Sequence, residues 1–319
     1  MKILIYGAGV IGCTYGCQFS SAGHDVSLLV RKGKAEKIKD KGIHISCADY
    51  RSGKRQTTET MFCPKVIENL SSDNDFDYIL ITVSSADLMD VLPSLSKSAG
   101  KAHIIFFLNL WDEFDEISGY LLPHQYSYGF PFMAGGGRNG NILDAIISGS
   151  KYSKTMLGNA DGKKTPELEI FFGILDEVNL KPFISGQIIN WLVPHYVFIA
   201  AISAGIINSG GTTKNFLGNK KLIKDTVKAI REGFGICIRK GINPKREKVN
   251  QLYYLPFFIC IPVMRKIFSN EDMASMFDGY LKHSVKDIKF MLDKVILSAK
   301  PYDIEIPYLT GLRKSIDSL

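Results

Sequence analysis

Three glycines near the start of the chain, Gly7, Gly9 and Gly12, have the spacing of a turn that binds the phosphates of a dinucleotide. In such a turn the first glycine permits a sharp reversal, the second lets the backbone approach a pyrophosphate, and the third lets a helix pack closely on a strand. The N-terminus of that helix presents unpaired N–H groups and a positive dipole to the phosphates. The alternative is a glycine turn that is purely structural.

The surrounding sequence supports the dinucleotide interpretation. The apolar run KILIY (2–6) precedes the glycines, a segment of helical length that ends near Gly23 follows them, and a second apolar run, DVSLLV (25–30), comes next. We therefore predict a strand, a phosphate-binding turn and a helix. The residues expected to contact the cofactor here are Gly7, Ala8, Gly9, Val10, Ile11 and Gly12.

The sequence LLVRKGK, at the end of the second apolar run, bears on the choice of cofactor. NAD sites usually place an Asp or Glu here for the ribose hydroxyls, whereas this chain has Arg31, with Lys32 beside it and Lys34 close by. A guanidinium pairs well with a phosphate dianion, which a carboxylate would repel. We therefore predict NADP(H) rather than NAD, with Arg31 and Lys32 at the 2′-phosphate. A solvated basic turn is the alternative.

Alternating strands and helices must position these residues. Two further apolar runs, 76–83 and 103–110, are separated by the helix-like segment 85–100. Strands spaced by helices predict crossover connections and a parallel sheet. Residues 125–158 mix aromatic and β-branched runs with glycines and predict hairpins. Thr165 as N-cap and Pro166 in the first turn then predict a helix over 165–179.

A second glycine cluster, GGGRNG (135–140), lacks the Gly-Lys-Ser/Thr sequence that a phosphate loop requires, so we interpret it as a hairpin turn. Strand signals stop near residue 186, and long helical stretches follow at 187–208, 219–240 and 271–299. We therefore predict two domains. An α/β, Rossmann-like, doubly wound parallel sheet should occupy residues 1–185, and an all-α domain should occupy residues 186–319.

The most apolar window, 253–264, is too short to span a bilayer and contains two prolines. We expect it to pack inside the helical domain. A contact with a membrane surface or with a second copy of the chain, in a homodimer, is the alternative.

Composition excludes several classes of protein. The chain has 319 residues, of which 45% are hydrophobic and 22% charged, as in an ordinary globular protein. Its net charge of +7 is scattered, without the basic stripe of a nucleic-acid-binding protein, and suits small anionic ligands. The six cysteines form neither a CxxC nor a zinc pattern, so we expect no metal site and buried free thiols. With no secretory leader evident, we expect a cytoplasmic protein.

Motifs over nearly the whole length resemble those of the ketopantoate reductases (2-dehydropantoate 2-reductases). They are ILIYGAGVIG, GHDVSLLVRKGKAEKIKDKGI, FDYILITVSSADL, HIIFFLN and SMFDGYLKHSVKDIKFMLDKVILSAKPYDIEIP. The resemblance implies a Rossmann domain joined to a helical domain, with a 2-oxo acid reduced by NADPH in the cleft between them. It also implies that Asn109 lies near the nicotinamide and the substrate, that Ser275 contacts the substrate, and that Asp287 replaces the family's glutamate. Val83 and Ser84, at a strand end, would line the cofactor.

Several positions depart from the family's pattern. Its proton donor is a lysine within Trp-x-Lys-x-x-x-Asn on the first helix of the second domain. Alignment without gaps places His195 at the lysine and Ile199 at the asparagine, with Trp191 two positions early. Ser84 also replaces a lysine that is often found there, and the family's Asn-Gly after the fifth strand is NLW in this chain. These changes leave the identity of the substrate open.

A histidine at the donor position keeps proton donation chemically feasible. Its ordinary pKa of about 6.5 suits donation near neutrality, so we hypothesise that His195 is the general acid. The alternative is a core histidine bonded to a carbonyl. Pro194 should either start the helix or kink it, and a kink would turn His195 toward the cleft.

Together these features predict NADPH-dependent reduction of a 2-oxo acid or a related small anionic carbonyl compound. We expect no nucleic-acid partner and no membrane span. Two alternatives stay open. One is the same chemistry on a larger apolar substrate, with residues 253–268 lining the pocket. The other is a non-catalytic protein that binds or senses NADP(H).

Overall fold

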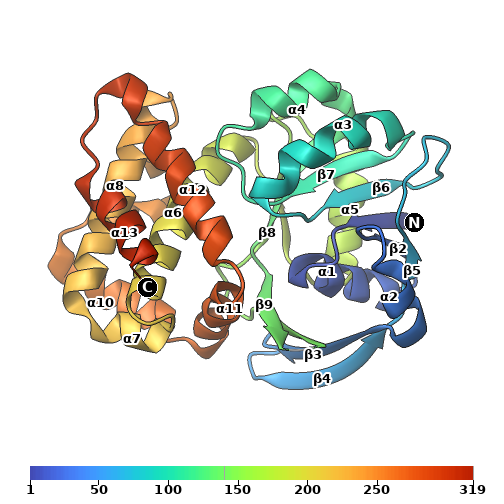
Figure 1. Cartoon of the computed structure of the whole chain (residues 1–319), viewed down its shortest axis with the longest axis horizontal. Coiled ribbons are helices and arrows are strands. Elements are labelled where there is room, and N and C mark those ends of the chain that lie inside the picture. The colour runs from blue at the N-terminus through green and yellow to red at the C-terminus, as the bar shows by residue number, and fades with distance from the viewer. Residues whose placement is uncertain (140, 319) are drawn as a thin grey trace. The chain divides into compact units, whose positions relative to one another are not determined.

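The computed structural model describes residues 1–139 and 141–318, which divide into two compact units. The first consists of Met1–Leu108 and Glu113–Ile188, and the second of Asn109–Asp112 and Ile189–Leu319. The first unit contains both strands and helices, whereas the second is helical (Figure 1). The segment Asn109–Asp112 packs within the helical unit although it follows a strand of the first unit almost directly.

The first unit contains an eight-stranded sheet with the order β12-β11-β8-β7-β6-β1-β2-β5. Its pairs are parallel except for the antiparallel pair of β8 and β11. Its strands are β1 (Lys2–Tyr6), β2 (Asp25–Leu29), β5 (Lys65–Ile67), β6 (Tyr78–Ile81), β7 (His103–Phe107), β8 (Tyr126–Pro131), β11 (Thr155–Gly158) and β12 (Pro182–Ile184). The predicted Rossmann-like fold is confirmed.

A second sheet, which the sequence analysis did not anticipate, has the order β4-β3-β10-β9. Its strands are β3 (Ile43–Asp49), β4 (Gln56–Phe62), β9 (Ala134–Asn139) and β10 (Ile142–Ile147). The hairpin of β9 and β10 is as predicted, but the interpretation of GGGRNG as a turn is wrong for residues 135–139, which belong to β9. A Cβ on Gly136 would lie 2.0 Å from the Asp144 carbonyl oxygen, so this strand requires glycine for a close approach to β10. Gly140 lies outside the described residues.

Helices cover both faces of the larger sheet. They are α1 (Val10–Ser21), α2 (Ala35–Lys41), α3 (Leu88–Ser98), α4 (Phe114–Tyr120) and α5 (Pro166–Glu177), with 3-10 turns η1 (Ser85–Asp87) and η2 (Pro123–Gln125). Rings of Tyr15 and Phe19 on α1 pack against Phe107 and Phe171, which joins α1 and α5 on one face. Figure 1 shows α3 and α4 on the other side of β6 and β7. The predicted cap of α5 is confirmed, because the Thr165 hydroxyl accepts a hydrogen bond from the Leu168 N–H.

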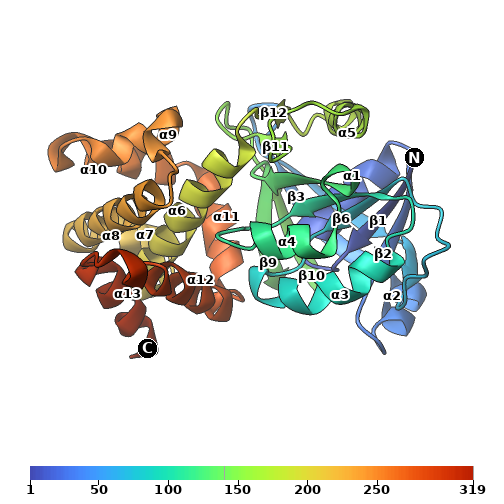
Figure 2. The same cartoon turned by 90° about the horizontal axis from the view of Figure 1, so that it is seen from above.

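The helical unit begins with α6 (Ile188–Asn208), and α8 and α13 lie side by side in it (Figure 2). Its other helices are α7 (Thr213–Gly218), α8 (Lys220–Arg239), α9 (Lys248–Gln251), α10 (Phe257–Phe268), α11 (Glu271–Leu281), α12 (Val285–Leu297) and α13 (Pro307–Asp317), with 3-10 turns η3 (Pro244–Arg246), η4 (Leu252–Tyr254) and η5 (Lys300–Tyr302). The helix predicted over 271–299 is two helices. The chain breaks at residues 282–284, where Ser284, of a type that favours helix starts, occupies the N-cap of α12.

Helix α6 runs through Pro194 without interruption, so it does not begin there. Within the described residues, α6 is long and apolar enough to cross a membrane, but 78% of its most apolar window is buried inside the structure. The other apolar segment, 253–268, is buried along one face only. Cys260, Ile261 and Met264 are buried, whereas Phe258 is 78% exposed.

All six cysteines are unpaired, and five are buried. Burial raises the pKa of the Cys13, Cys47 and Cys237 thiols to about 12, so they are protonated and act as packing groups. Cys63 is exposed, and the prediction of buried thiols is wrong at that position.

His103, at the start of β7, makes the stability of the first unit depend on pH. Its Nε2 lies 2.8 Å from Ser127 Oγ, which donates to Asn159 Oδ1 at 2.6 Å. Burial lowers the pKa of His103 to about 4. The unfolded chain therefore takes up the proton first, so this stabilisation is present above about pH 6.5 and is lost as the pH falls toward 4.

As the pH falls from 6.5 to 4, we expect the titration of His103 to lower the free energy of unfolding by about 1.4 kcal/mol per pH unit. The variant His103→Gln removes this titration but keeps a polar partner for Ser127. Denaturant midpoints at neutral and at mildly acidic pH should show a smaller acid-induced loss in the variant. Equal losses would contradict the assignment.

Candidate active site

The glycine turn lies where the strand order of the larger sheet reverses. β1 pairs with β2 on one side and with β6 on the other, and Tyr6 is in register with both Leu29 and Ile81. The segments that follow these parallel strands therefore leave the sheet at the same edge. In open α/β sheets this switch point is where ligands bind.

The backbone of the turn is packed so tightly that one of its positions excludes a side chain. A Cβ on Gly12 would lie 2.4 Å from the Gly7 carbonyl oxygen and 2.5 Å from Thr82 Oγ1. Gly7 has a φ of 119°, which favours glycine. A Cβ on Gly9 would come no closer than 4.0 Å to another group, the Thr82 carbonyl oxygen. The space beside Gly9 is therefore open to a ligand.

Thr82, directly after β6, fixes the start of the turn. Its hydroxyl donates to the carbonyl oxygens of Tyr6 and Gly7, at 3.2 and 3.1 Å. Its role depends on the pairing of β1 with β6, so no local sequence pattern indicates it. Gly9 is the N-cap of α1 and supplies no capping side chain, so the first N–H groups of α1 have no intrahelical partner. A glycine turn of this shape, opening on free N–H groups, fits a dinucleotide pyrophosphate.

Arg31 follows β2 at the same edge, and its side chain is 90% exposed. Its Nη2 lies 3.9 Å from Asp87 Oδ2, and Ser84 Oγ lies 2.9 Å from the same carboxylate oxygen. Arg31 and Ser84 thus both contact the carboxylate of Asp87. Val83 directly precedes Ser84 in the chain. Exposed ion pairs contribute only about 0–1 kcal/mol, so the contact with Asp87 competes weakly with a phosphate.

The basic loop that carries Arg31 and Lys32 has a fixed backbone. The Ala35 N–H donates to Glu68 Oε1 at 3.0 Å. Backbone hydrogen bonds from Ala35, and to a lesser extent from Gly33 and Lys34, lower the pKa of the Glu68 carboxyl. Glu68 follows β5 and lies far from this loop in sequence, so sequence patterns give no signal for this contact.

His195 lies on α6 in an apolar environment. Its ring stacks on Trp191, with centroids 4.5 Å apart and an interplanar angle of 18°, and Phe198 lies 5.8 Å away. Burial lowers the pKa of His195 to about 3. The imidazole is therefore neutral at physiological pH.

Ser275 and Asp287 are half-buried on the neighbouring helices α11 and α12. The rings of Phe198 and Phe277 lie 6.5 Å apart, which packs α11 against the helix that carries His195. Burial raises the pKa of the Tyr280 phenol, and the charge of Asp287 raises it further, so these two side chains are close.

Asn109 is half-buried in the segment Asn109–Asp112, which Trp111 anchors to the helices. The Trp111 indole donates to Ser298 Oγ at 2.7 Å and packs on Tyr196, with centroids 5.7 Å apart. The predicted residues thus fall into two groups. The glycine turn and the basic residues belong to the first unit, and the predicted substrate residues belong to the helical unit.

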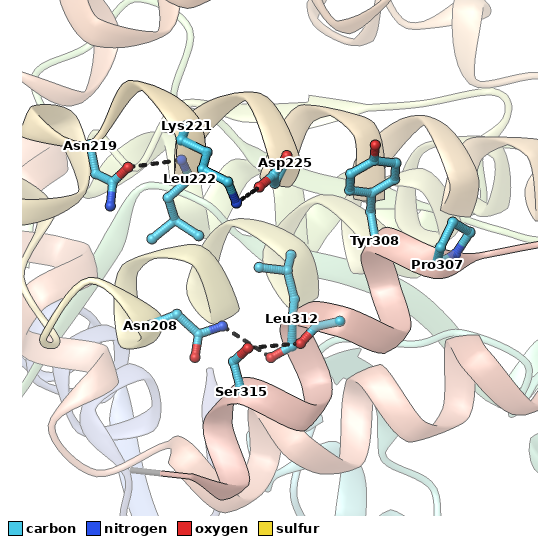
Figure 3. Close-up of a pocket in the computed structure, with 10 residues that line it drawn as sticks. Asn208, Asn219, Lys221, Leu222, Asp225, Pro307, Tyr308, Leu312 and Ser315 are labelled. Carbon is cyan, nitrogen blue, oxygen red and sulfur yellow. Dashed lines mark hydrogen bonds and ion pairs between the residues drawn. The ribbon is translucent and has the colours of Figure 1, made fainter.

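The helical unit also contains a pocket of about 430 Å³ at the end of α6, the start of α8 and α13 (Figure 3). None of the predicted site residues lines it. Figure 3 shows its polar groups bonded to one another, with Lys221 paired to Asp225 at 2.9 Å and Asn208 donating to the Leu312 carbonyl at 3.0 Å. Its lining residues are Asn208, Asn219, Lys221, Leu222, Asp225, Pro307, Tyr308, Gly311, Leu312 and Ser315.

Comparisons with known proteins agree with this architecture. Residues 3–158 match the family model described as ketopantoate reductase PanE/ApbA. A Bacillus subtilis protein described as the uncharacterized oxidoreductase YkpB is 25% identical over 207 residues, which span 65% of this chain and 64% of that protein. The 2-dehydropantoate 2-reductase of Pyrococcus abyssi is 22% identical over 329 residues, which span 100% of this chain and 99% of that protein.

Solved structures share the fold over the whole chain. D-mandelate dehydrogenase, in a ternary structure with NADH and anilino(oxo)acetate, has a TM-score of 0.75 and 16% sequence identity, covering 100% of this chain and 97% of that one. The family model includes the glycine turn, the basic end of β2 and the strand end at Thr82, all of which meet at one edge of the sheet. Together these matches show that residues 3–158 are similar to the ketopantoate reductase PanE/ApbA family, and that the chain is similar to relatives described as oxidoreductases.

Proposed function

We propose that this chain uses NADPH to reduce a 2-oxo acid or a related small carbonyl compound. The observation that carries the proposal is the edge of the sheet at β1, β2 and β6. There a turn that excludes a side chain at Gly12 lies beside Arg31, which is exposed at the end of β2. The names of the relatives support the substrate class, because 2-dehydropantoate and anilino(oxo)acetate both carry an oxo group beside a carboxyl group.

The residues of the first unit would bind and orient the cofactor. The N–H groups of Val10, Ile11 and Gly12 would bind the pyrophosphate, and Arg31 with Lys32 would bind the 2′-phosphate. Thr82 holds the turn in place before any ligand arrives, so little reorganisation is needed on binding. When bound, the reduced nicotinamide supplies the hydride for the carbonyl carbon.

The carbonyl oxygen must gain a proton as the hydride arrives. We assign this proton to His195, with Asn109 and Ser275 holding the substrate and Asp287 accepting a hydrogen bond from it. Burial alone keeps the His195 imidazole neutral, so the donor role requires that the negative charge of the bound substrate raise the pKa of His195. A neutral carbonyl compound would lack this effect, which is why the proposal favours an anionic substrate.

Arg31→Glu is expected to reverse the preference for the cofactor. Loss of a charge-assisted hydrogen bond costs about 1.5–3 kcal/mol, so the Kd for NADPH should rise about 10- to 100-fold. The Kd for NADH, which lacks the 2′-phosphate, should stay within about twofold. Fluorescence titration of both cofactors measures this difference.

Lys101→Glu provides a matched control for the charge reversal. Lys101 is exposed and lies two residues before the first residue of β7, at the opposite edge of the sheet from the glycine turn. Lys101→Glu should change neither the Kd for NADPH nor the Kd for NADH. An unchanged preference in Arg31→Glu would remove the NADP assignment.

The reaction itself is tested by NADPH oxidation with a panel of 2-oxo acids that includes ketopantoate. Oxidation that depends on one of these compounds supports the proposed function. Tight NADPH binding without turnover on any of them would favour the non-catalytic alternative instead.

A further inference from the structure

A second positive charge reaches the glycine turn from a part of the chain that the dinucleotide motif does not include. Arg138 lies at the end of β9, and its Nη2 donates to the carbonyl oxygen of Ala8, inside the turn, at 3.5 Å. This contact joins residues 130 positions apart. Arg138 is exposed, so a ligand that binds at the turn can also reach its guanidinium group.

The fold explains why this arginine lies there. β9 packs against α1, and its glycines, Gly135–Gly137, carry no side chains that would hold the helix away. Gly136 has a φ of 121°, and a Cβ there would collide with the Asp144 carbonyl oxygen of β10. This glycine-dependent stretch directly precedes Arg138 and brings it to the N-terminal end of α1.

The electrostatic environment of α1 agrees with this placement. Burial raises the pKa of the Cys13 thiol, and the charge of Arg138 is the largest influence opposing that rise. Cys13 lies at the end of the first turn of α1, next to Gly12. The positive charge of Arg138 therefore acts on the first turn of α1, where the helix would bind phosphate.

We propose that Arg138 binds the pyrophosphate of the dinucleotide, from the second sheet, and so contributes to the affinity for NADPH and NADH alike. This inference rests on the proposed function. A guanidinium presents five N–H donors in a planar fork that suits phosphate oxygens, so it can bridge the Ala8 carbonyl and a phosphate. Arg31 would select the 2′-phosphate, whereas Arg138 would bind a group that both cofactors share.

The test compares the Kd values of NADPH and NADH for the wild type, Arg138→Ala, Arg138→Lys and Lys101→Ala, by fluorescence titration and calorimetry. In Arg138→Ala both Kd values should rise about tenfold and by the same factor, because one charge-assisted contact is lost. Arg138→Lys should recover part of the loss, since a lysine keeps the charge but not the fork. Lys101→Ala removes the same charge at the opposite edge of the sheet and should bind as the wild type does.

Three outcomes would overturn the proposal. The first is that Arg138→Ala binds both cofactors as tightly as the wild type. The second is that Arg138→Ala loses affinity for NADPH alone, which would place Arg138 at the 2′-phosphate. The third is that Arg138→Lys binds as weakly as Arg138→Ala while both variants melt well below the wild type, which indicates a structural role. If the wild type binds neither cofactor, the proposed function fails first, and the inference fails with it.

Discussion

Gly12→Ala is expected to raise the Kd for NADPH about 100-fold and to destabilise the first unit by about 1–3 kcal/mol. The added methyl group would lie 2.4 Å from the Gly7 carbonyl oxygen, 2.5 Å from Thr82 Oγ1 and 2.7 Å from Ile5 Cγ2. Backbone and a buried strand residue cannot yield to it, so α1 must move away from β1. That movement displaces the N–H groups that would bind the pyrophosphate.

Two other glycines serve as controls for this effect. Gly173, exposed in the interior of α5, has no atom within 4 Å of an added Cβ, so Gly173→Ala should leave binding unchanged and stabilise the first unit by about 0.5–1 kcal/mol, the opposite sign to Gly12→Ala. Gly9→Ala has room in the unliganded turn, where the nearest atom is 4.0 Å away. It should fold normally yet bind NADPH more weakly, because its methyl group would occupy space beside the phosphates. If Gly12→Ala bound NADPH as the wild type does, the turn would not be the cofactor site.

His195→Ala is expected to lower kcat by about 10²- to 10⁴-fold, the range of a lost general acid, while the Kd for NADPH stays within about twofold. The reason for this separation is that His195 belongs to the helical unit and the glycine turn to the first unit. Steady-state kinetics with an active 2-oxo acid, together with cofactor titration, measures both quantities.

The dependence on pH distinguishes a proton donor from a packing residue. The pKa of His195 is lowered to about 3, so the protonated imidazole becomes about tenfold rarer with each unit by which the pH rises. If His195 is the proton donor, kcat/KM should therefore fall about tenfold per unit of rising pH through the neutral range. His195→Gln, which preserves most of the volume beside Trp191, should lose both the activity and this dependence. Normal kcat in His195→Gln, with only the melting temperature reduced, would identify His195 as a core histidine. His124→Ala, at an exposed histidine of η2, controls for the loss of an imidazole.

Much of the first unit follows from its sequence because local signals there agree with the fold. Apolar runs that end in glycine predict buried parallel strands, and the GxGxxG spacing predicts the turn whose geometry Gly7 and Gly12 show. Thr165 and Pro166 similarly predict the start of α5. In each case the residue type is required by contacts within a few positions or by one neighbouring strand.

Other features arise from pairings that no local pattern encodes. The second sheet pairs β3 with β10, almost a hundred residues further along the chain, and this pairing is what brings Arg138 to Ala8. Thr82 and Glu68 fix the glycine turn and the loop that carries Arg31 through contacts that depend on strand order. The break between α11 and α12 was also missed, since their apolar periodicity continues across residues 282–284.

His195 shows a different limit of sequence reasoning. Its alignment with the family's lysine indicates a donor, whereas its stacking on Trp191 and its low pKa depend on packing that only the structure describes. The position in the sequence therefore identifies a candidate residue, and its environment sets the protonation state that the chemistry requires.

The central claim is that the strand, turn and helix at residues 2–21 bind a phosphorylated dinucleotide, and calorimetric titration of the wild-type chain with NADPH tests it most directly. The account predicts saturable binding of one NADPH per chain, at least about tenfold tighter than NADH under the same conditions. An absence of heat and of fluorescence change with either reduced cofactor would contradict it.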